Sequence, residues 1–269
     1  MKKYQRYIGA FERDDEFPFN CPNCKRSTLF LDESSWFEKE TESSKKAHSH
    51  VEHYPDWDEY IYSGSYKCSN PQCNEVVLTA GVAFWEESID YENDEDNNIV
   101  AVDARWVKYY KPRLFLPSLD FFEIPEKTPT ELRKLIKESF GLVLQSAGAA
   151  SNKLRVALEL LLTKHQIQSK TDDGKFIRLH NRIESIPEEN ILFEFKDSLL
   201  AIKWIGNAGS HEEDRINLQI VFDEFEIIQD LLKNIYSDRN IRTIVKEVNE
   251  NKGPLSFWEQ FRKLNSNQN

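Results

Sequence analysis

The spacing of hydrophobic residues divides the chain into two parts. Up to about residue 125, apolar residues form short runs rich in aromatic and β-branched side chains, which is typical of β-strands. Beyond residue 128 they recur at intervals of three and four, which predicts helices with one apolar face. We expect strands over residues 28–31 (with an extension to 36–37), 60–66, 76–84, 99–102 and 106–110.

A series of helices is predicted in the second part. Thr128, Pro129 and Glu131 indicate a helix start in which the threonine caps, the proline takes the first position and the glutamate completes a capping box. We expect this first helix to break or kink near Gly148. Further helices are predicted over residues 151–166, 175–186, 191–207 and 216–236, with shorter ones over 241–248 and 255–264.

Polar stretches separate these elements. Residues 39–55 are interpreted as a charged inserted loop, and residues 86–98, a run of acids and asparagines, as an exposed, mobile loop. Prolines then punctuate a crossing segment, which we interpret as the linker between two domains. These prolines are Pro112, Pro117, Pro125 and Pro129.

The four cysteines form two pairs with the spacing of metal ligands. Two residues separate Cys21 from Cys24, and four separate Cys68 from Cys73. Pro and Asn inside both loops favour tight turns, and two such turns can direct four thiolates at one tetrahedral Zn²⁺ ion. Two disulfides are an alternative that a cytoplasmic chain disfavours, and a redox pair leaves the second pair unexplained. We expect a structural zinc, because four thiolates leave no position for a catalytic water.

Three histidines, His48, His50 and His53, lie in the predicted inserted loop. A short histidine-rich tract is a compositional hint of metal binding. Histidines in a polar loop are usually solvated, so a second metal site is conceivable here but is not our expectation.

Negative charge is concentrated in the first part. Residues 1–128 carry 15 Lys and Arg against 25 Asp and Glu, a net charge of −10, whereas the remainder carries 20 against 21. Phosphate binding depends mainly on basic side chains, so any nucleic-acid contact is expected in the helical part. No apolar run approaches the ~18 residues of a membrane helix, and the first residues lack the apolar core of a signal peptide. We expect a soluble, cytoplasmic protein without membrane contact.

Residues 199–211, LLAIKWIGNAGSH, combine an apolar-periodic segment with candidate chemistry. Lys203, Asn207 and His211 follow one another at steps of four, so a continuing helix would place them on one stripe. Gly206 and Gly209 each weaken a helix by roughly 1 kcal/mol relative to alanine. They therefore mark either a helix C-cap, with His211 an ordinary capping or core histidine, or a place of close packing.

This stretch and an earlier one resemble the motifs of a known family. Gly206-Asn207 with His211 resembles the G-N-x-x-x-H signature of a bacterial family of unknown function with a HEPN-like helical domain. The segment LRVALEL, residues 154–160, is similar to the core of an upstream helix in that family. The motifs and the helix after them span residues 128–236, roughly half of the chain. The resemblance implies a helical domain that dimerises and takes part in prokaryotic defence, since similar domains occur alone or joined to restriction-enzyme subunits.

Arg155 and Glu159 lie four residues apart within the upstream motif. They can form a helix-surface ion pair worth roughly 0.2–0.5 kcal/mol. Alternatively, they face the region from Asn207 to His211.

These observations predict an α+β protein. Residues 1–125 are expected to form a zinc-ribbon-like β domain with acidic loops, and residues 126–269 an all-α, HEPN-like bundle. The first functional hypothesis is a non-catalytic module that docks a protein partner or binds RNA and forms a homodimer through its helices.

The second hypothesis is a metal-independent endoribonuclease. In it His211 is the general acid and base, Lys203 supplies positive charge and Asn207 orients the phosphate. Many HEPN nucleases carry an arginine at the position that Gly206 occupies here, and a lysine lacks the bidentate fork of arginine. We therefore favour binding over cleavage.

Overall fold

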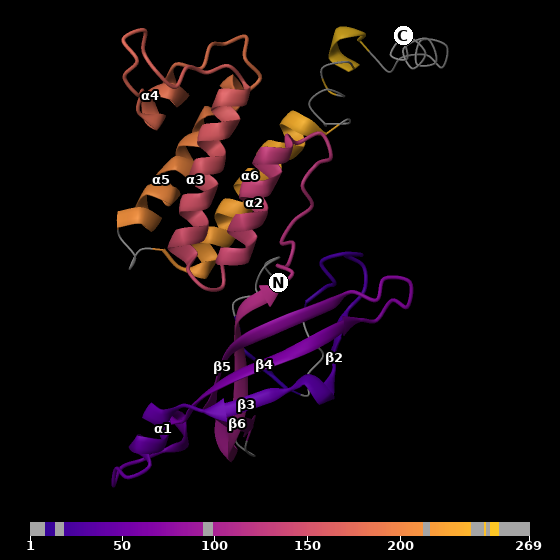
Figure 1. The fold of residues 1–269 in the computed structure, drawn as a ribbon, viewed down its shortest axis with the longest axis vertical. Coiled ribbons are helices and arrows are strands. Elements are labelled where there is room, and N and C mark those ends of the chain that lie inside the picture. The colour runs from indigo at the N-terminus through magenta and orange to yellow at the C-terminus, as the bar shows by residue number, and fades with distance from the viewer. Residues whose placement is uncertain are drawn as a thin grey trace.

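The computed structural model describes residues 9–13, 19–93, 99–211, 216–237, 245 and 248–252. Over these residues the chain is α+β, as expected: an antiparallel sheet lies at one end and a group of helices at the other (Figure 1). No helix in this part of the chain is both long enough and apolar enough to cross a bilayer. The helix predicted over residues 255–264, and most of the one over 241–248, lie outside the described residues.

The described sheet contains six antiparallel strands. Its order is β1-β6-β5-β4-β2, and β3 pairs with β4 beyond the end of β2. Leu29 lies opposite Cys68 at one end of β4, whereas Glu40 lies opposite Tyr60 at the other. The strands are β1 (Phe11–Glu12), β2 (Leu29–Leu31), β3 (Phe37–Glu40), β4 (Glu59–Cys68), β5 (Val76–Asn93) and β6 (Ile99–Leu116).

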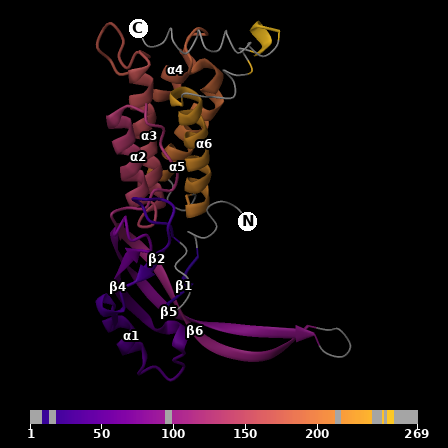
Figure 2. The same cartoon turned by 90° about the vertical axis from the view of Figure 1, so that its right-hand side faces the viewer.

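The acidic run beginning at residue 86 is not a loop up to residue 93, contrary to our prediction. Residues 86–93 continue β5 and pair with β6 in a long hairpin arm that projects from the rest of the sheet (Figure 2). Such a ribbon lacks the apolar alternation of a half-buried strand, on which the prediction depended. Pro112, predicted in the linker, lies in β6 opposite Gly81, beside a register shift that accommodates a residue without an N–H donor.

The predicted inserted loop also contains regular structure. Residues 39 and 40 belong to β3, and α1 (Glu42–Ala47) follows after Thr41, whose side chain accepts from the Ser44 amide. A short 3-10 helix, Pro55–Trp57, then leads into β4. This insertion is therefore an ordered element attached where β3 and β4 meet.

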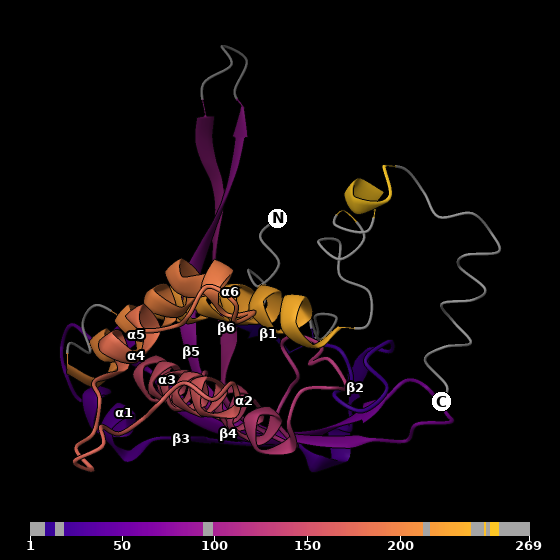
Figure 3. The same ribbon diagram turned by 90° about the horizontal axis from the view of Figure 1, so that it is seen from above.

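Helices α2, α3, α5 and α6 lie side by side, with the short α4 against α5 (Figure 3). Their apolar faces form the helical part of the core, as the three-four spacing predicts. The helices are α2 (Thr130–Leu142), α3 (Ala147–Lys164), α4 (Leu179–Glu184), α5 (Lys196–His211) and α6 (Leu218–Tyr236).

Most helix boundaries differ by a few residues from the prediction, and the starts of α2 and α3 also differ in their caps. Pro129 is the N-cap of α2, and the buried Thr128 hydroxyl makes no capping bond. The break before α3 falls ahead of Gly148, because Ser146 caps that helix by accepting from the Ala149 amide at 3.1 Å. Gly148 therefore lies inside the first turn of α3.

An aromatic cluster packs the segment between β6 and α2 against the helices. Phe121 packs on Phe140 and Phe222, with ring centroids 5.6 and 5.3 Å apart, and Phe122 lies 4.9 Å from Phe140. Phe121 and Phe122 precede the predicted boundary at residue 125, yet their rings pack on the helices. The buried residues of the sheet and the helices consequently form one continuous core.

A helical fragment should therefore be more stable when it begins at Pro117 than when it begins at Glu126. The shorter fragment loses Phe121 and Phe122, and full burial of each ring contributes about 1.5–3 kcal/mol. Urea unfolding followed by helical circular dichroism measures the difference. Equal midpoints for the two fragments would contradict the assignment of these rings to the helical core.

Candidate metal centre and basic groove

Two tight loops bring the four cysteines together. In the first, before β2, the Cys21 amide donates to the Ser27 carbonyl at 2.9 Å, and Lys25 takes a left-handed φ of 61°. In the second, after β4, the Cys68 amide donates to the Glu75 carbonyl at 2.9 Å. Because β2 pairs with the end of β4, the loops meet at the same end of the sheet.

The sulfur atoms are spaced as metal ligands. Cys21 Sγ lies 3.7 Å from Cys73 Sγ, and Cys24 Sγ lies 3.6 Å from Cys68 Sγ. All four sulfurs lie within 4.8 Å of one another, and these four described cysteines form no disulfide. A tetrahedral ion with bonds of ~2.3 Å would hold its thiolates about 3.8 Å apart. The predicted cluster is therefore present and could hold a metal ion.

The backbone prepares this cluster for thiolates. The Asn70 amide donates to Cys68 Sγ at 3.4 Å, and the backbone of Arg26 lowers the pKa of the Cys24 thiol. Burial raises the pKa of the Cys21 and Cys68 thiols. Metal binding would therefore have to displace protons from the buried pair, which couples binding to pH.

The two motifs of the helical part meet where α3 crosses α5. A Cβ built on Gly206 would lie 2.7 Å from Arg155 Cβ, and one on Gly209 would lie 2.9 Å from the Gly148 carbonyl oxygen. Contacts this short leave no room for a side chain. The glycines therefore permit close packing, and the C-cap interpretation is wrong because α5 continues through both of them to His211.

A basic groove opens beside this crossing. Its volume is about 430 Å³, and its wall is formed by α3, α5 and the start of α4. None of the described residues that line it carries a carboxylate, although the chain has a net charge of −11. A second groove of about 530 Å³ shares Arg155, Arg178 and Leu179 with it. The lining residues of the basic groove are Arg155, Arg178, Leu179, His180, Asn181, Lys203, Trp204 and Asn207.

Lys203 and Trp204 form the α5 side of the basic groove. The Lys203 side chain is largely buried, and its Nζ lies 2.9 Å from the centre of the Trp204 ring. Desolvation and the positive charge of Arg155 lower the pKa of Lys203. The Trp204 side chain is 58% exposed, which leaves ring surface accessible to a ligand.

The arginines of the basic groove retain donors. Arg155 forms the predicted ion pair with Glu159 at 3.2 Å, but its buried Nε has no hydrogen-bond partner among the described residues. Arg178 is exposed at the N-terminus of α4 and makes no ion pair with any described residue. The exposed Arg178 guanidinium therefore suits an anion that approaches from solvent.

The predicted stripe of Lys203, Asn207 and His211 is only partly described. Lys203 and Asn207 both line the basic groove. His211 is the last residue of α5, and only its backbone belongs to the described part of the structure. Arg178, His180 and Trp204 were missed as site residues, because they come from a loop-helix junction and an exposed face that no spacing rule links to residue 203.

Two family models match the chain. Residues 9–115 match a domain of unknown function, DUF8608, and residues 137–260 match a second domain of unknown function, DUF4145. Comparisons with curated proteins and with solved structures found no significant match. The matches fit the expected resemblance to families of unknown function, and their descriptions name no activity. The cysteine cluster and the basic groove are therefore the features of this chain that point to a function.

Proposed function

We propose that this protein binds single-stranded RNA through the basic groove and that a structural zinc ion stabilises its sheet. The observation that carries the proposal is a groove whose described lining has three cationic side chains and one histidine but no carboxylate, on a strongly acidic chain. Such a local concentration of positive charge attracts phosphates.

The aromatic side chains favour a single strand over a duplex. Single-strand binding proteins combine a basic groove with aromatic rings on which bases stack. Trp204 is exposed, and the His180 ring lies 6.2 Å from it. In our proposal Trp204 stacks on a base while Arg155, Arg178 and Lys203 bind the phosphates on either side.

The zinc assignment follows from the donor set. Four thiolates are soft ligands that select zinc among the common structural metals, and a closed four-sulfur site supplies stability rather than catalysis. In our proposal the ion joins the two cysteine loops in the manner of a zinc ribbon.

We further propose that the helical part is HEPN-like, forms a homodimer and acts in prokaryotic defence. The packing of Gly206 on Arg155 supports binding over cleavage, because an arginine at position 206 would collide with α3. The metal-independent endoribonuclease with His211 and Lys203 stays the alternative prediction. An RNA-cleavage assay beside the binding experiment distinguishes the two hypotheses.

Wild-type protein should bind a fluorescent single-stranded RNA, measured by anisotropy. Trp204→Ala should weaken binding about tenfold, since stacking contributes about 1–3 kcal/mol per base. Arg178→Gln should reduce the dependence of log Kd on log salt by about 0.7, the contribution of one phosphate contact on a single strand.

Lys153→Gln is the matched control. It removes one positive charge from α3, but Lys153 pairs with Glu138 at 3.0 Å rather than lining the basic groove. Equal losses in all three variants, or tight binding of a protein partner without any RNA binding, would exclude the proposed RNA site. Metal-free cleavage by the wild type that disappears in His211→Ala would establish the ribonuclease alternative instead.

A further inference from the structure

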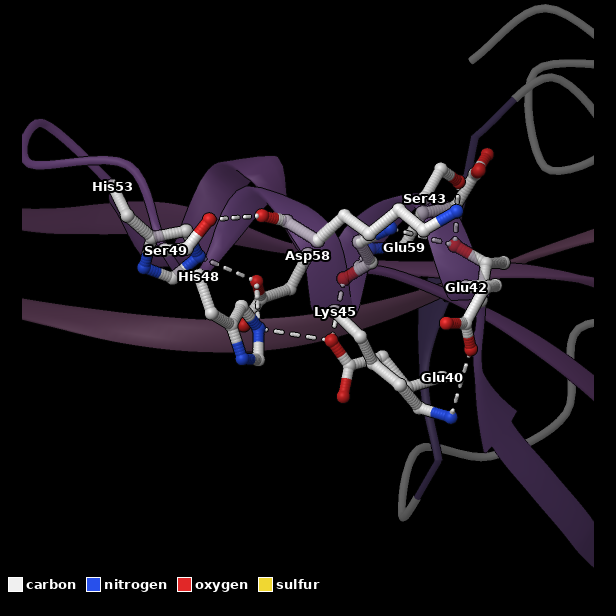
Figure 4. Close-up of polar contacts among 12 residues, drawn as sticks. Glu40, Glu42, Ser43, Lys45, His48, Ser49, His53, Asp58 and Glu59 are labelled. Carbon is white, nitrogen blue, oxygen red and sulfur yellow. Dashed lines mark hydrogen bonds and ion pairs between the residues drawn. The ribbon is translucent and has the colours of Figure 1, made fainter.

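A second cluster of candidate metal ligands lies in the insertion between β3 and β4. His48 is the C-cap of α1, His53 follows in the next turn, and Asp58 ends the 3-10 helix before β4. Glu40 reaches the same place from the end of β3. Figure 4 shows these four side chains converging. The cysteine loops lie at the other end of β4, where β2 pairs with it.

The converging atoms are all potential metal ligands. Asp58 Oδ1 lies 2.9 Å from His48 Nε2 and 2.8 Å from His53 Nε2. The ligand atoms of His48, His53 and Asp58 lie within 4.8 Å of one another. Zinc bonds to nitrogen and oxygen of about 2.0–2.1 Å would separate such ligands by about 3.3 Å. The two carboxylate–imidazole distances would each have to lengthen by about half an ångström to admit an ion.

One donor of the cluster is shared between two acceptors. One imidazole nitrogen carries at most one proton, yet His48 Nε2 lies 2.9 Å from both Asp58 Oδ1 and Glu40 Oε1. Asp58 Oδ1 can accept from both imidazoles, since a carboxylate oxygen has two lone pairs. A cation between His48, His53 and Asp58 would take an electron pair from each of the three at the same time.

The surroundings hold the carboxylates in place. The buried Ser44 hydroxyl donates to Glu40 Oε1 at 2.7 Å and accepts from the Glu59 amide at 3.2 Å. The side chain of Asp58 is only 13% exposed. The two carboxylates oppose two imidazoles, a charge balance that suits a divalent cation. His48 is 43% exposed, so an ion can reach the cluster from solvent.

We propose that His48, His53 and Asp58 form a second metal site that takes Zn²⁺ or another divalent first-row transition metal. Two imidazole nitrogens and one carboxylate are ligands that suit such ions, whereas Mg²⁺ and Ca²⁺ favour sites made of oxygen atoms alone. Three protein ligands leave a position open to water, next to the Glu40 carboxylate. The proposal depends on neither the basic groove nor the cysteine cluster.

His50 provides a matched control on the same insertion. Its ring lies 5.3 Å from the Trp57 ring, and its Nδ1 accepts from the Glu52 amide at 3.2 Å. It is therefore not part of the cluster. In the sequence the signal of this cluster is the spacing of His48, His53 and Asp58 at steps of five residues, rather than the histidine tract.

Titration of the metal-free full-length protein with Co²⁺ tests the proposal. The wild type should bind about two equivalents, one with sulfur-to-cobalt charge-transfer bands and one with only the visible bands of nitrogen and oxygen ligands. Uptake of only one equivalent of Co²⁺ would overturn the proposal. So would a second equivalent of Co²⁺ that doubles the intensity of the charge-transfer bands. This readout needs no variant and does not depend on how the variants fold.

Variants then assign the second equivalent to its residues. His53→Gln and Asp58→Asn should each remove the equivalent without charge-transfer bands, while His50→Gln retains both. Cys68→Ser should remove only the charge-transfer bands. Retention of the second equivalent in His53→Gln and in Asp58→Asn would place it elsewhere and contradict the site.

Discussion

Replacing Cys68 with serine should abolish metal binding at the four-cysteine cluster and unfold the end of the sheet. Structural zinc sites have apparent binding free energies of about 10–16 kcal/mol, and this binding energy supports folding. Cys68 is both the last residue of β4 and the partner of Leu29 in β2. Loss of the ion should release the two loops and the β2–β4 pairing together.

Hydrogen exchange followed by mass spectrometry measures this effect. Amides in residues 20–31 and 67–77 should lose protection in Cys68→Ser, whereas α3 and α5 keep theirs. Ser69→Ala, one residue away, is the control and should keep both the metal and the protection. Full zinc content in Cys68→Ser, or unchanged exchange after its loss, would disprove a structural role for the ion.

The cysteine cluster was accessible from the sequence because its signal is local. Two spacings and the turn-forming residues between them predict two loops, and no cysteine remains outside the pattern. The helices were predictable for a similar reason, since burial on one face leaves a periodic trace. Their boundaries were less so, because Thr128 and Ser146 are both good caps and only Ser146 makes the capping bond.

The structural role of Gly206 and Gly209 could not be predicted from their own helix, because it depends on the packing of α5 against α3. Gly206 weakens α5 in isolation, and local rules therefore allow a helix end there. The reason for the glycine lies in α3, where Arg155 and Gly148 approach too closely for side chains on α5. Tertiary packing of this kind leaves no mark in the residues that flank a glycine.

The basic groove and the histidine cluster are likewise products of tertiary structure. Arg178 and Lys203 are 25 residues apart in sequence and share a groove only because α4 packs on α5. His53 and Asp58 were within reach of a spacing argument, but Glu40 joins them only through the β3–β4 pairing.

Glu224→Gln should stabilise the protein at neutral and alkaline pH, by an amount that increases with pH. Glu224 is completely buried on α6, and its Oε2 accepts from the Ser151 hydroxyl at 2.6 Å. Its Oε1 has no hydrogen-bond partner among the described residues. Burial raises the pKa of this carboxyl group to about 8, although the Ser151 hydrogen bond lowers it in part.

The sign of the effect follows from proton binding. In the unfolded chain the pKa of a glutamate is about 4.3, so between pH 4.3 and 8 the folded state holds a proton that the unfolded state has lost. The free energy of unfolding therefore falls as pH rises, by up to about 1.4 kcal/mol per pH unit. The contribution is fully present below about pH 4.3 and is lost above the folded pKa. Glutamine keeps the shape and does not titrate, so the variant escapes this loss.

Urea unfolding of wild type and Glu224→Gln at pH 5, 6, 7 and 8 measures the difference. The stability of the variant minus that of the wild type should rise over this range by up to about 4 kcal/mol, while other titrating groups cancel in the subtraction. Glu226→Gln, two residues away on the exposed face of α6, is the control for the loss of a carboxyl group that is not buried. A pH-independent difference for Glu224→Gln would mean that this carboxyl group ionises inside the folded helices, and that the core around Ser151 solvates its charge.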